Sequence, residues 1–321
     1  MNLVGKKVLL ILPKYFGYEK KIVSEMIKDG AEVKTVFENV NYYNKLYSIL
    51  LKVFRKKRNK ILTRYYEKKC RDYSPDIVLV IRGETLTPDF IEYFKLKNKN
   101  ATWFMYQWDS INNNKNAIRI AKYFDKVSTF DKVDSEKMNW LYRPLFFTEE
   151  SQREEKRQYC LSFIASLHSE RANIYLKLKS RNNNQFLYLY SNIFHFIIHK
   201  YIRRANSFKV IKSKDVHFDS LSLEKTNEIM SQSDIIIDYT HPSQTGFTMR
   251  TCESIGHRCK LITNNKMVRW ADFFNDNNVL IYEGDNIIVP KDFIFSEYKE
   301  LPSSVYSRYS ISTWLKDVLC L

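Results

Sequence analysis

One segment of the sequence, Ser233 to Asn265, strongly restricts how the chain can fold. An apolar run, Ile235 to Tyr239, is followed by a polar loop that contains Gly246, by a predicted helix from Phe247 to Gly256, and by a second apolar run, Lys260 to Thr263. The order strand, loop, helix, strand is the repeating unit of a parallel α/β sheet. A helix that begins after such a loop directs unpaired N–H groups and its positive dipole end toward the loop. This arrangement predicts an anion site, and phosphate is the usual ligand of such sites.

Two charged side chains of the predicted helix can serve this site. Arg250 and Glu253 are three residues apart, so they share a face of the helix one turn from its beginning. An arginine matches phosphate oxygens with a fork of N–H groups, and a glutamate can accept hydrogen bonds from ribose hydroxyls. A salt-bridged pair on an ordinary crossover helix would have the same spacing.

The pattern Gln244-x-Gly246-x-Thr248-x-Arg250-x-x-Glu253, followed by the strand Leu261-Ile262-Thr263, resembles the donor-binding signature of nucleotide-sugar-dependent glycosyltransferases of the GT-B fold. It is similar in particular to the branch found in bacterial capsule and O-antigen gene clusters and to spore-maturation-type glycosyltransferases. The resemblance implies an α/β protein with two Rossmann-like domains facing a central cleft. The N-terminal domain would bind the acceptor and the C-terminal domain the donor.

The resemblance also implies roles for individual residues. Glu253 would bind the nucleotide ribose, Arg250 the pyrophosphate, and the loop residues Gln244, Thr245 and Gly246 would lie near the donor sugar. Many retaining members carry another glutamate eight residues before the ribose-binding one, and this chain has Thr245 there, which leaves the stereochemical class open. The donor would be of the UDP type, and no cofactor or metal ion would be required.

Length and charge set the wider limits. The chain has 321 residues, 44% of them hydrophobic, which suits two globular domains. Its formal net charge of +16 favours polyanionic neighbours: nucleic acid, an anionic membrane surface, or phosphate-bearing substrates. A coding bias toward Lys, Asn, Ile and Tyr would raise the charge as well. The five cysteines show no metal-binding spacing. No run is long enough to cross a bilayer, and no signal-peptide pattern is present, so we expect a cytoplasmic protein.

The first half reads as a Rossmann-like domain, residues 1–150. Its clearest buried strands, Pro75–Ile81 and Thr102–Gln107, are each followed by charged residues, and ligands of open α/β sheets gather beyond the carboxyl ends of strands. Arg82 and Glu84 are therefore candidates for the acceptor side of the cleft, unless they only stabilise a turn. Asp109 is the candidate catalytic base, because an inverting transferase needs a group that removes the acceptor hydroxyl proton. A helix N-cap is the alternative role for Asp109.

The domain boundary is expected within a charged run, Thr148–Arg157, so that the second half spans residues 151–300. The resemblance implies that a closing helix in 301–321 packs back toward the N-terminal domain. The strand Tyr159–Ala165 leads into a polar loop and a helix, a second arrangement suited to phosphate. Ser166 and Arg171 are the candidate donor-binding residues there, since the resembled family places an arginine near the donor pyrophosphate. His168 is a weaker candidate.

Two segments are rich in both aromatic and basic residues, 41–70 and 186–208. Such a composition is typical of helices that lie on anionic membranes. A helix packed against its own sheet with a solvated basic face would have the same composition. Peripheral association with the inner face of the cytoplasmic membrane is thus an expectation.

The sequence as a whole favours a glycosyltransferase that moves a sugar from a nucleotide sugar to a glycan or lipid-linked acceptor in cell-surface polysaccharide biosynthesis. A sugar-nucleotide epimerase or hydrolase of the same fold is one alternative, but its chemistry needs extra carboxylates and histidines around the sugar, and the six histidines do not suggest such a cluster. A basic nucleic-acid-binding protein is another, although no recognition motif for a specific nucleic acid is present.

Overall fold

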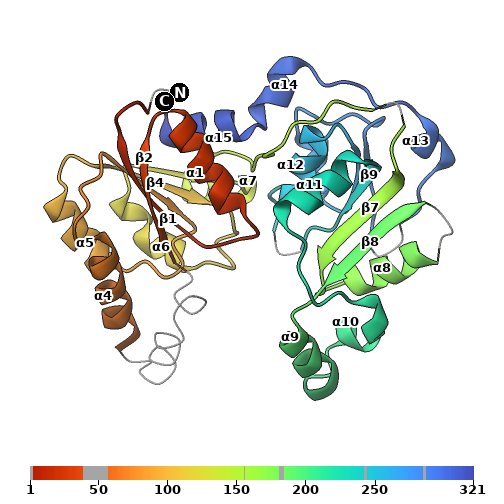
Figure 1. Ribbon diagram of the computed structural model, residues 1–321, viewed down its shortest axis with the longest axis horizontal. Coiled ribbons are helices and arrows are strands. Elements are labelled where there is room, and N and C mark those ends of the chain that lie inside the picture. Colours follow the sequence, from red (N-terminus) through yellow and green to blue (C-terminus); the bar gives the residue numbers. More distant parts are fainter. Residues whose placement is uncertain (1–2, 39–56, 155, 181–183, 242–243, 285–286) are drawn as a thin grey trace. The chain divides into compact units, whose positions relative to one another are not determined.

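The chain folds into two compact units, which are described separately. The computed structural model describes residues 3–38, 57–154, 156–180, 184–241, 244–284 and 287–321 (Figure 1). Unit 1 comprises Met1–Leu145 together with Ile311–Leu321, and unit 2 comprises Phe146–Ser310. Of the basic aromatic segment 41–70, the part up to residue 56 lies outside the described residues.

Unit 1 is a parallel sheet of six strands in the order β2-β1-β3-β4-β5-β6. The central strands carry almost only apolar side chains, as expected of strands covered by helices on both faces. Helices α1 and α15 contact one another, and so do α4 and α5, which cover the opposite face. The strands are β1 (Lys7–Leu12), β2 (Glu32–Phe37), β3 (Ile77–Ile81), β4 (Thr102–Gln107), β5 (Lys126–Thr129) and β6 (Leu141–Tyr142); the helices are α1 (Tyr18–Lys28), α4 (Arg58–Cys70), α5 (Pro88–Lys97), α6 (Asn116–Ile120), η2 (Ala121–Tyr123) and α7 (Lys132–Met138).

The α4 helix buries Leu62, Tyr65 and Tyr66 in the unit 1 core. The hydroxyl of Tyr65 donates a hydrogen bond to the carbonyl of Phe37 at the end of β2 (2.8 Å). For the described part of segment 41–70, the structure therefore shows a helix that covers its own sheet.

Helix α15 (Ile311–Leu319) completes the core of unit 1, although it follows unit 2 in the sequence. Trp314 is fully buried, and its ring meets that of Tyr106 on β4 edge to face, with ring centroids 4.9 Å apart. Asp317 of the same helix forms an ion pair with Arg143, with 2.8 Å between the carboxylate oxygen and Nε of the guanidinium.

Unit 2 is a parallel sheet of five strands in the order β11-β10-β9-β7-β8. Helices α8 and α10 contact one another on one face, and α11 and α12 contact one another on the other. The strands are β7 (Tyr159–Ser166), β8 (Gln185–Tyr190), β9 (Ser233–Asp238), β10 (Lys260–Thr263) and β11 (Val279–Ile281); the helices are α8 (Arg171–Lys179), α9 (Ile193–Ile197), η3 (Ile198–Ile202), α10 (Asn206–Lys209), η4 (Ser213–Asp215), α11 (Leu223–Ser231), α12 (Met249–Gly256), η5 (Lys266–Trp270), α13 (Lys291–Phe295) and α14 (Ser303–Arg308).

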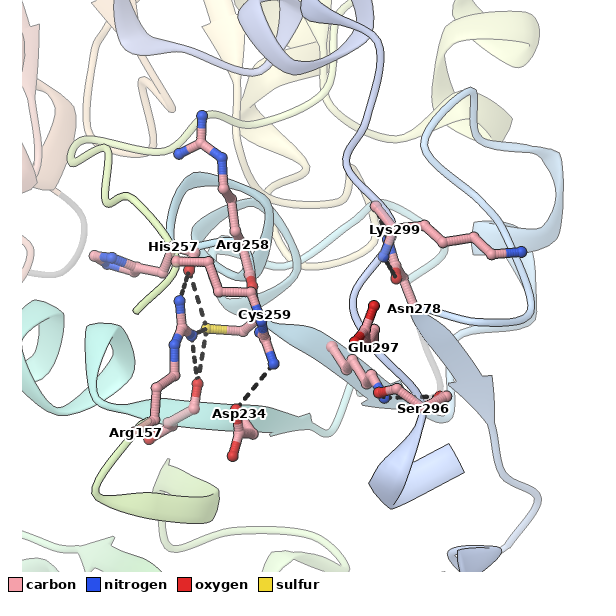
Figure 2. A network of polar contacts seen from close by, with 12 residues as sticks. Arg157, Asp234, His257, Arg258, Cys259, Asn278, Ser296, Glu297 and Lys299 are labelled. Atoms are coloured by element: carbon pink, nitrogen blue, oxygen red, sulfur yellow. Dashed lines mark hydrogen bonds and ion pairs between the residues drawn. The ribbon is translucent and has the colours of Figure 1, made fainter. Parts of the chain in front are cut away.

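The charged run that precedes β7 is attached to unit 2 by two arginines. The Arg157 guanidinium donates hydrogen bonds to the carbonyl oxygens of Ser233 (2.6 Å) and His257 (2.7 Å), and Figure 2 shows it directed at His257 and Cys259. Arg153 pairs with Asp234 at 2.9 Å. Because these bonds tie the run to the sheet of unit 2, the division between the units falls before it, after Leu145.

Candidate functional site

The topology of unit 2 marks one place at the edge of its sheet. The chain passes from β7 to β8 on one side of β7, and then crosses to β9 on the other side, so the connections diverge between β7 and β9. Ligands of open α/β sheets bind at such a switch point, beyond the carboxyl ends of the strands. The two loops that meet there lead into α8 and α12; their described residues are 167–170 in the first, and 239–241 and 244–248 in the second.

Arg171 joins these two loops. It is the first residue of α8, and its guanidinium donates hydrogen bonds to the carbonyl oxygen of Tyr239 (2.9 Å) and to Nε2 of His168 (2.7 Å). A longer contact reaches the carbonyl oxygen of Ser166, at 3.4 Å. The structure thus brings the predicted residues Ser166 and Arg171 together at the switch point of unit 2.

His168 is a neutral hydrogen-bond acceptor in this arrangement. Burial lowers the pKa of His168 to about 3, and the nearby positive charge of Arg171 contributes in the same direction. Since Arg171 donates to Nε2, the ring proton lies on Nδ1, 3.1 Å from the Ser169 hydroxyl oxygen. His168 therefore fixes the direction of the Arg171 guanidinium without adding a charge.

The histidines are closer together than the sequence suggests, and the expectation that they do not cluster is wrong. The rings of His168 and His241 lie 6.3 Å apart, and His195 is near enough to influence the pKa of His168. These residues come from the loops after β7 and β9 and from α9, which the topology places at the same edge of the sheet. Spacing along the chain carries no signal of this.

A buried carboxylate that the sequence analysis missed, Asp238, organises the second loop. It ends β9 and accepts hydrogen bonds from the hydroxyls of Thr240 (3.1 Å) and Thr263 (3.2 Å), with Thr251 at 3.5 Å. Burial raises the pKa of Asp238, while Arg171 and the threonine hydroxyls oppose the shift. The available signal was a carboxylate at the end of an apolar strand, the same signal that selects Asp109.

The predicted donor loop is held by two asparagines that follow β10. The Asn265 side-chain amide donates to the carbonyl oxygens of Thr245 (3.1 Å) and Gly246 (3.2 Å), and the Asn264 amide donates to that of Thr240 (3.0 Å). Gln244 lies half-buried in the same loop. The loop then enters α12 at the N-cap Thr248, whose hydroxyl accepts a hydrogen bond from the backbone N–H of Thr251.

Arg250 and Glu253 lie on one face of α12, as their spacing predicts, and form an ion pair. Glu253 is buried, with a side chain only 1% exposed. Arg250 also contacts the carbonyl oxygen of Ile164 on β7 at 3.5 Å, two residues before Ser166. The pair is therefore next to β7 and partly satisfied within the protein, so the structure contains the salt bridge that the spacing left open as an alternative.

The carboxyl edge of unit 1 brings together the three remaining candidate residues. The Arg82 guanidinium lies 3.0 Å from the Glu84 carboxylate and 3.6 Å from that of Asp109. Asp109 also accepts a hydrogen bond from the Asn113 amide at 2.9 Å. It does not cap α6, whose N-cap is Lys115. The candidates thus form one charged cluster beside the switch point between β1 and β3.

Backbone strain accompanies both switch points. Arg82, Phe16 and Ser169 adopt left-handed backbone conformations, with φ of 75°, 51° and 49°, and each lies in a loop after a strand that flanks a switch point. Such conformations cost free energy in residues other than glycine and concentrate at functional sites. At Arg82 the strain is held by hydrogen bonds from Gln107 and Asn114 to its carbonyl oxygen, at 2.8 and 2.6 Å.

Two further features of the unit 1 edge escaped the sequence analysis. Tyr15 is 49% exposed and packs against Trp108, with ring centroids 5.8 Å apart, so an aromatic surface adjoins Asp109. Glu38, just past β2, is buried, and burial together with Glu84 raises its pKa to about 8, against the opposing effect of Arg82. Among the residues that the structure describes, no three potential ligands of the His, Cys, Asp or Glu type lie close enough to hold a metal ion.

The fold of the whole chain matches solved structures of very different sequence. It is similar to Anabaena Alr3699/HepE in complex with UDP and glucose, with a TM-score of 0.59, 9% identity and 98% of both chains covered. It is also similar to the UDP-GlcNAc 2-epimerase of Neisseria meningitidis bound to UDP-GlcNAc (TM-score 0.54, 10% identity, 98% of both chains). For the UDP-GlcNAc 2-epimerase of Methanocaldococcus jannaschii the TM-score is 0.52 and the identity 11%, over 98% of this chain and all of that one (100%).

No protein-family model matches the sequence, and no curated protein is significantly similar to it. The structural likeness, at these identities, concerns the fold. The expected fold class, two Rossmann-like α/β domains of the GT-B type, is confirmed.

Proposed function

We propose that this protein is a glycosyltransferase that uses a nucleotide sugar, with the nucleoside diphosphate part of that sugar bound at the carboxyl edge of unit 2. The observation that carries the proposal is Arg171, which begins a helix and links the loops on both sides of the switch point. A guanidinium and a helix N-terminus together favour a pyrophosphate. Proteins of the same fold that were solved with UDP-GlcNAc, or with UDP and glucose, support UDP as the nucleotide.

In this proposal the fixed positive groups stabilise the leaving diphosphate. As the bond between the sugar's anomeric carbon and the diphosphate oxygen breaks, its electron pair stays with UDP, and Arg171 with the α8 N-terminus neutralises the new charge. The Arg250–Glu253 pair would open when the nucleotide binds, with Arg250 turning to phosphate and Glu253 to the ribose hydroxyls. Gln244, Thr245 and Gly246 would contact the sugar.

For an inverting reaction, we propose Asp109 as the base of unit 1. An acceptor hydroxyl oxygen forms the new bond to the anomeric carbon, and its proton passes to the Asp109 carboxylate. Arg82 and Asn113 hold this carboxylate in place before the acceptor arrives. The acceptor class that we propose, from the sequence resemblance, is a glycan or lipid-linked glycan of a cell-surface polysaccharide.

Nucleotide binding is the first test, because it needs no knowledge of the acceptor. Saturating UDP should raise the melting temperature of the purified protein, since a ligand at about 100 times its Kd stabilises the native state by about 2.7 kcal/mol. Arg171→Gln and Glu253→Gln should each reduce that shift by more than half. The measurement is a thermal melt with UDP, GDP, ADP and CMP in parallel.

The matched control is Arg258→Gln. Arg258 precedes β10, at the opposite edge of the same sheet, where it pairs with Glu300 at 3.1 Å. The substitution removes the same charge but should leave the UDP shift intact. If no nucleotide stabilises the folded protein, or if Arg258→Gln reduces the shift as much as Arg171→Gln, the proposed site is wrong.

A second candidate, a UDP-sugar epimerase, is favoured by the proximity of His168 and His241, since epimerisation needs groups that move protons near the sugar. The two reactions differ in their need for an acceptor. An epimerase changes the configuration of a sugar carbon when only the enzyme and the UDP-sugar are present. A transferase needs an acceptor, and it releases UDP in proportion to the amount of acceptor glycosylated. NMR of UDP-GlcNAc incubated with the protein distinguishes them.

A further inference from the structure

Unit 2 carries an exposed apolar stripe on the segment that follows β8. The residues recur at helical spacing along α9 and η3, so they lie on one side of the helical segment. This stripe, called here the α9 face, consists of Ile193 (45% exposed), Phe194 (73%), Ile197 (44%), Ile198 (41%), Tyr201 (61%) and Ile202 (74%). Contiguous apolar surface of this kind marks an interaction site when polar residues surround it.

The other side of the segment fastens it to unit 2. Phe196 is buried against Phe208 and Phe218, with ring centroids 6.0 and 5.4 Å away. The Lys200 ammonium donates hydrogen bonds to the carbonyl oxygens of Phe208 (3.1 Å) and Ile211. The exposure of the α9 face is therefore a property of a helix that is already anchored to the domain, and Figure 1 shows α9 and α10 projecting beyond the end of β8.

The charged side chains of the segment that carries the α9 face are all basic. From Arg171 to Lys214 the sequence contains no Asp or Glu, and the part nearest the face contributes Lys200, Arg203, Arg204, Lys209, Lys212 and Lys214. Arg203 and Arg204 are exposed directly beside Ile202. In the segment that follows, Lys209 at the end of α10, Lys212, and Lys214 in η4 are exposed as well. An apolar stripe with a cationic margin matches a surface that is apolar within and anionic at its boundary.

We propose that the α9 face docks unit 2 on an anionic lipid bilayer, with Phe194 and Ile202 among the acyl chains and the basic margin at the headgroups. This inference goes beyond the proposed function and does not depend on it. An amphipathic segment of this type lies in the plane of the interface. A second copy of the chain is a poorer occupant, because a symmetric pairing would bring the basic margins against one another.

The segment lies at the same edge of the sheet as the proposed nucleotide site. Helix α9 begins after the carboxyl end of β8, at the same edge of the sheet as the Arg171 site, and His195 lies close enough to His168 to influence its pKa. Docking through α9 would hold this edge of unit 2 near the membrane. A membrane-borne acceptor would then be presented at the edge where the nucleotide sugar is proposed to bind.

Flotation with lipid vesicles tests the inference on the full chain. We expect the protein to bind vesicles that contain about a third phosphatidylglycerol in phosphatidylcholine, and to bind pure phosphatidylcholine vesicles far more weakly. Arg203→Gln/Arg204→Gln should lower the partition coefficient roughly 30-fold, because each basic residue near an anionic surface raises this coefficient by a factor of about five. Phe194→Ser/Ile202→Ser should lower it at least as much.

The matched control is Phe295→Ser/Leu96→Ser, which removes one phenylalanine and one aliphatic side chain that are 81% and 72% exposed outside the α9 face. The control should bind vesicles like the unmodified protein, and every variant should keep its UDP-induced melting shift. Three results would overturn the inference: no preference for anionic vesicles, an equal loss in the control, or self-association of the protein that disappears in Phe194→Ser/Ile202→Ser while vesicle binding stays unchanged.

Discussion

At the scale of single residues, charged side chains of unit 2 are oriented by contacts with segments far away in the chain. Arg171, Arg250 and Glu253 could be selected because they follow polar loops or share a helix face, and the structure places them at or beside the carboxyl edge of unit 2. The spacing of Arg250 and Glu253 already allowed their salt bridge, but the contacts of Arg171 could not be selected. Arg171 is directed by the Tyr239 carbonyl, 68 residues away in the chain, and such a contact depends on the order of strands in the sheet.

Glu38 provides a prediction about pH. Its folded-state pKa is about 8, raised from 4.5, chiefly by burial. Between these values the folded protein binds more protons than the unfolded chain, so Glu38 makes the free energy of unfolding fall as pH rises from 4.5 to 8, by at most about 1.4 kcal/mol per pH unit. Glu38→Gln cannot titrate. The stability of the variant relative to the unmodified protein should therefore increase across this range.

Urea unfolding at several pH values measures this difference. Glu136→Gln, which removes an exposed carboxylate of α7 in the same unit, is the control. Curves of stability against pH that run parallel for Glu38→Gln and the unmodified protein would contradict the assignment of a protonated carboxyl at Glu38.

At the scale of elements, the apolar patterns predicted most strands closely. Thr102–Gln107 and Lys260–Thr263 begin and end where the sequence indicates. The start of α12 was placed two residues early, at Phe247 instead of Met249, because Thr248 stays extended to cap the helix with its hydroxyl. The exposed α9 face illustrates the opposite limit: its periodicity predicts a helix, but which side is buried is decided by Phe208 and Phe218, which lie later in the chain.

The end of α12 yields a prediction about packing. Gly256, its last residue, has no room for a side chain: an added Cβ would lie 2.5 Å from the Glu149 carbonyl oxygen and 2.7 Å from the Phe147 ring. Gly256→Ala should therefore lower the free energy of unfolding by about 1–3 kcal/mol. Thermal or urea unfolding measures the change. Ser304→Ala, at an exposed position of α14, should have little effect, and an equally small effect of Gly256→Ala would show that the segment 146–151 yields easily.

At the scale of the whole molecule, the repeated α/β pattern was enough to predict two Rossmann-like domains, because parallel sheets need alternating strands and helices. The assignment of segments to units needs information that local patterns lack. The apolar stripe of α15 indicates only that this helix packs against some apolar surface of the protein. That the surface belongs to unit 1 follows from Trp314 and Tyr106, which are far apart in the sequence.

The contact between Trp314 and Tyr106 predicts that the two units respond separately to mutation. Trp314→Ala removes a fully buried ring from unit 1 and should cost about 3–5 kcal/mol of stability. Hydrogen exchange should accelerate in α1 and β4, which α15 contacts, and stay unchanged in the strands of unit 2. Trp270→Ala, which truncates a side chain that is 80% exposed, is the control. Equal acceleration in both units would show that they unfold as one.

The return of the chain to unit 1 at Ile311 also governs how the protein is made. On the ribosome, the residues of unit 1 before Leu145 emerge first, yet the surface around Tyr106 stays uncovered until all of unit 2 has been synthesised and α15 follows. Domains generally fold as units during synthesis, so unit 2 can finish folding while unit 1 is still incomplete. The nascent chain would therefore carry a partly exposed aromatic core through most of its translation, the period in which it most needs a chaperone.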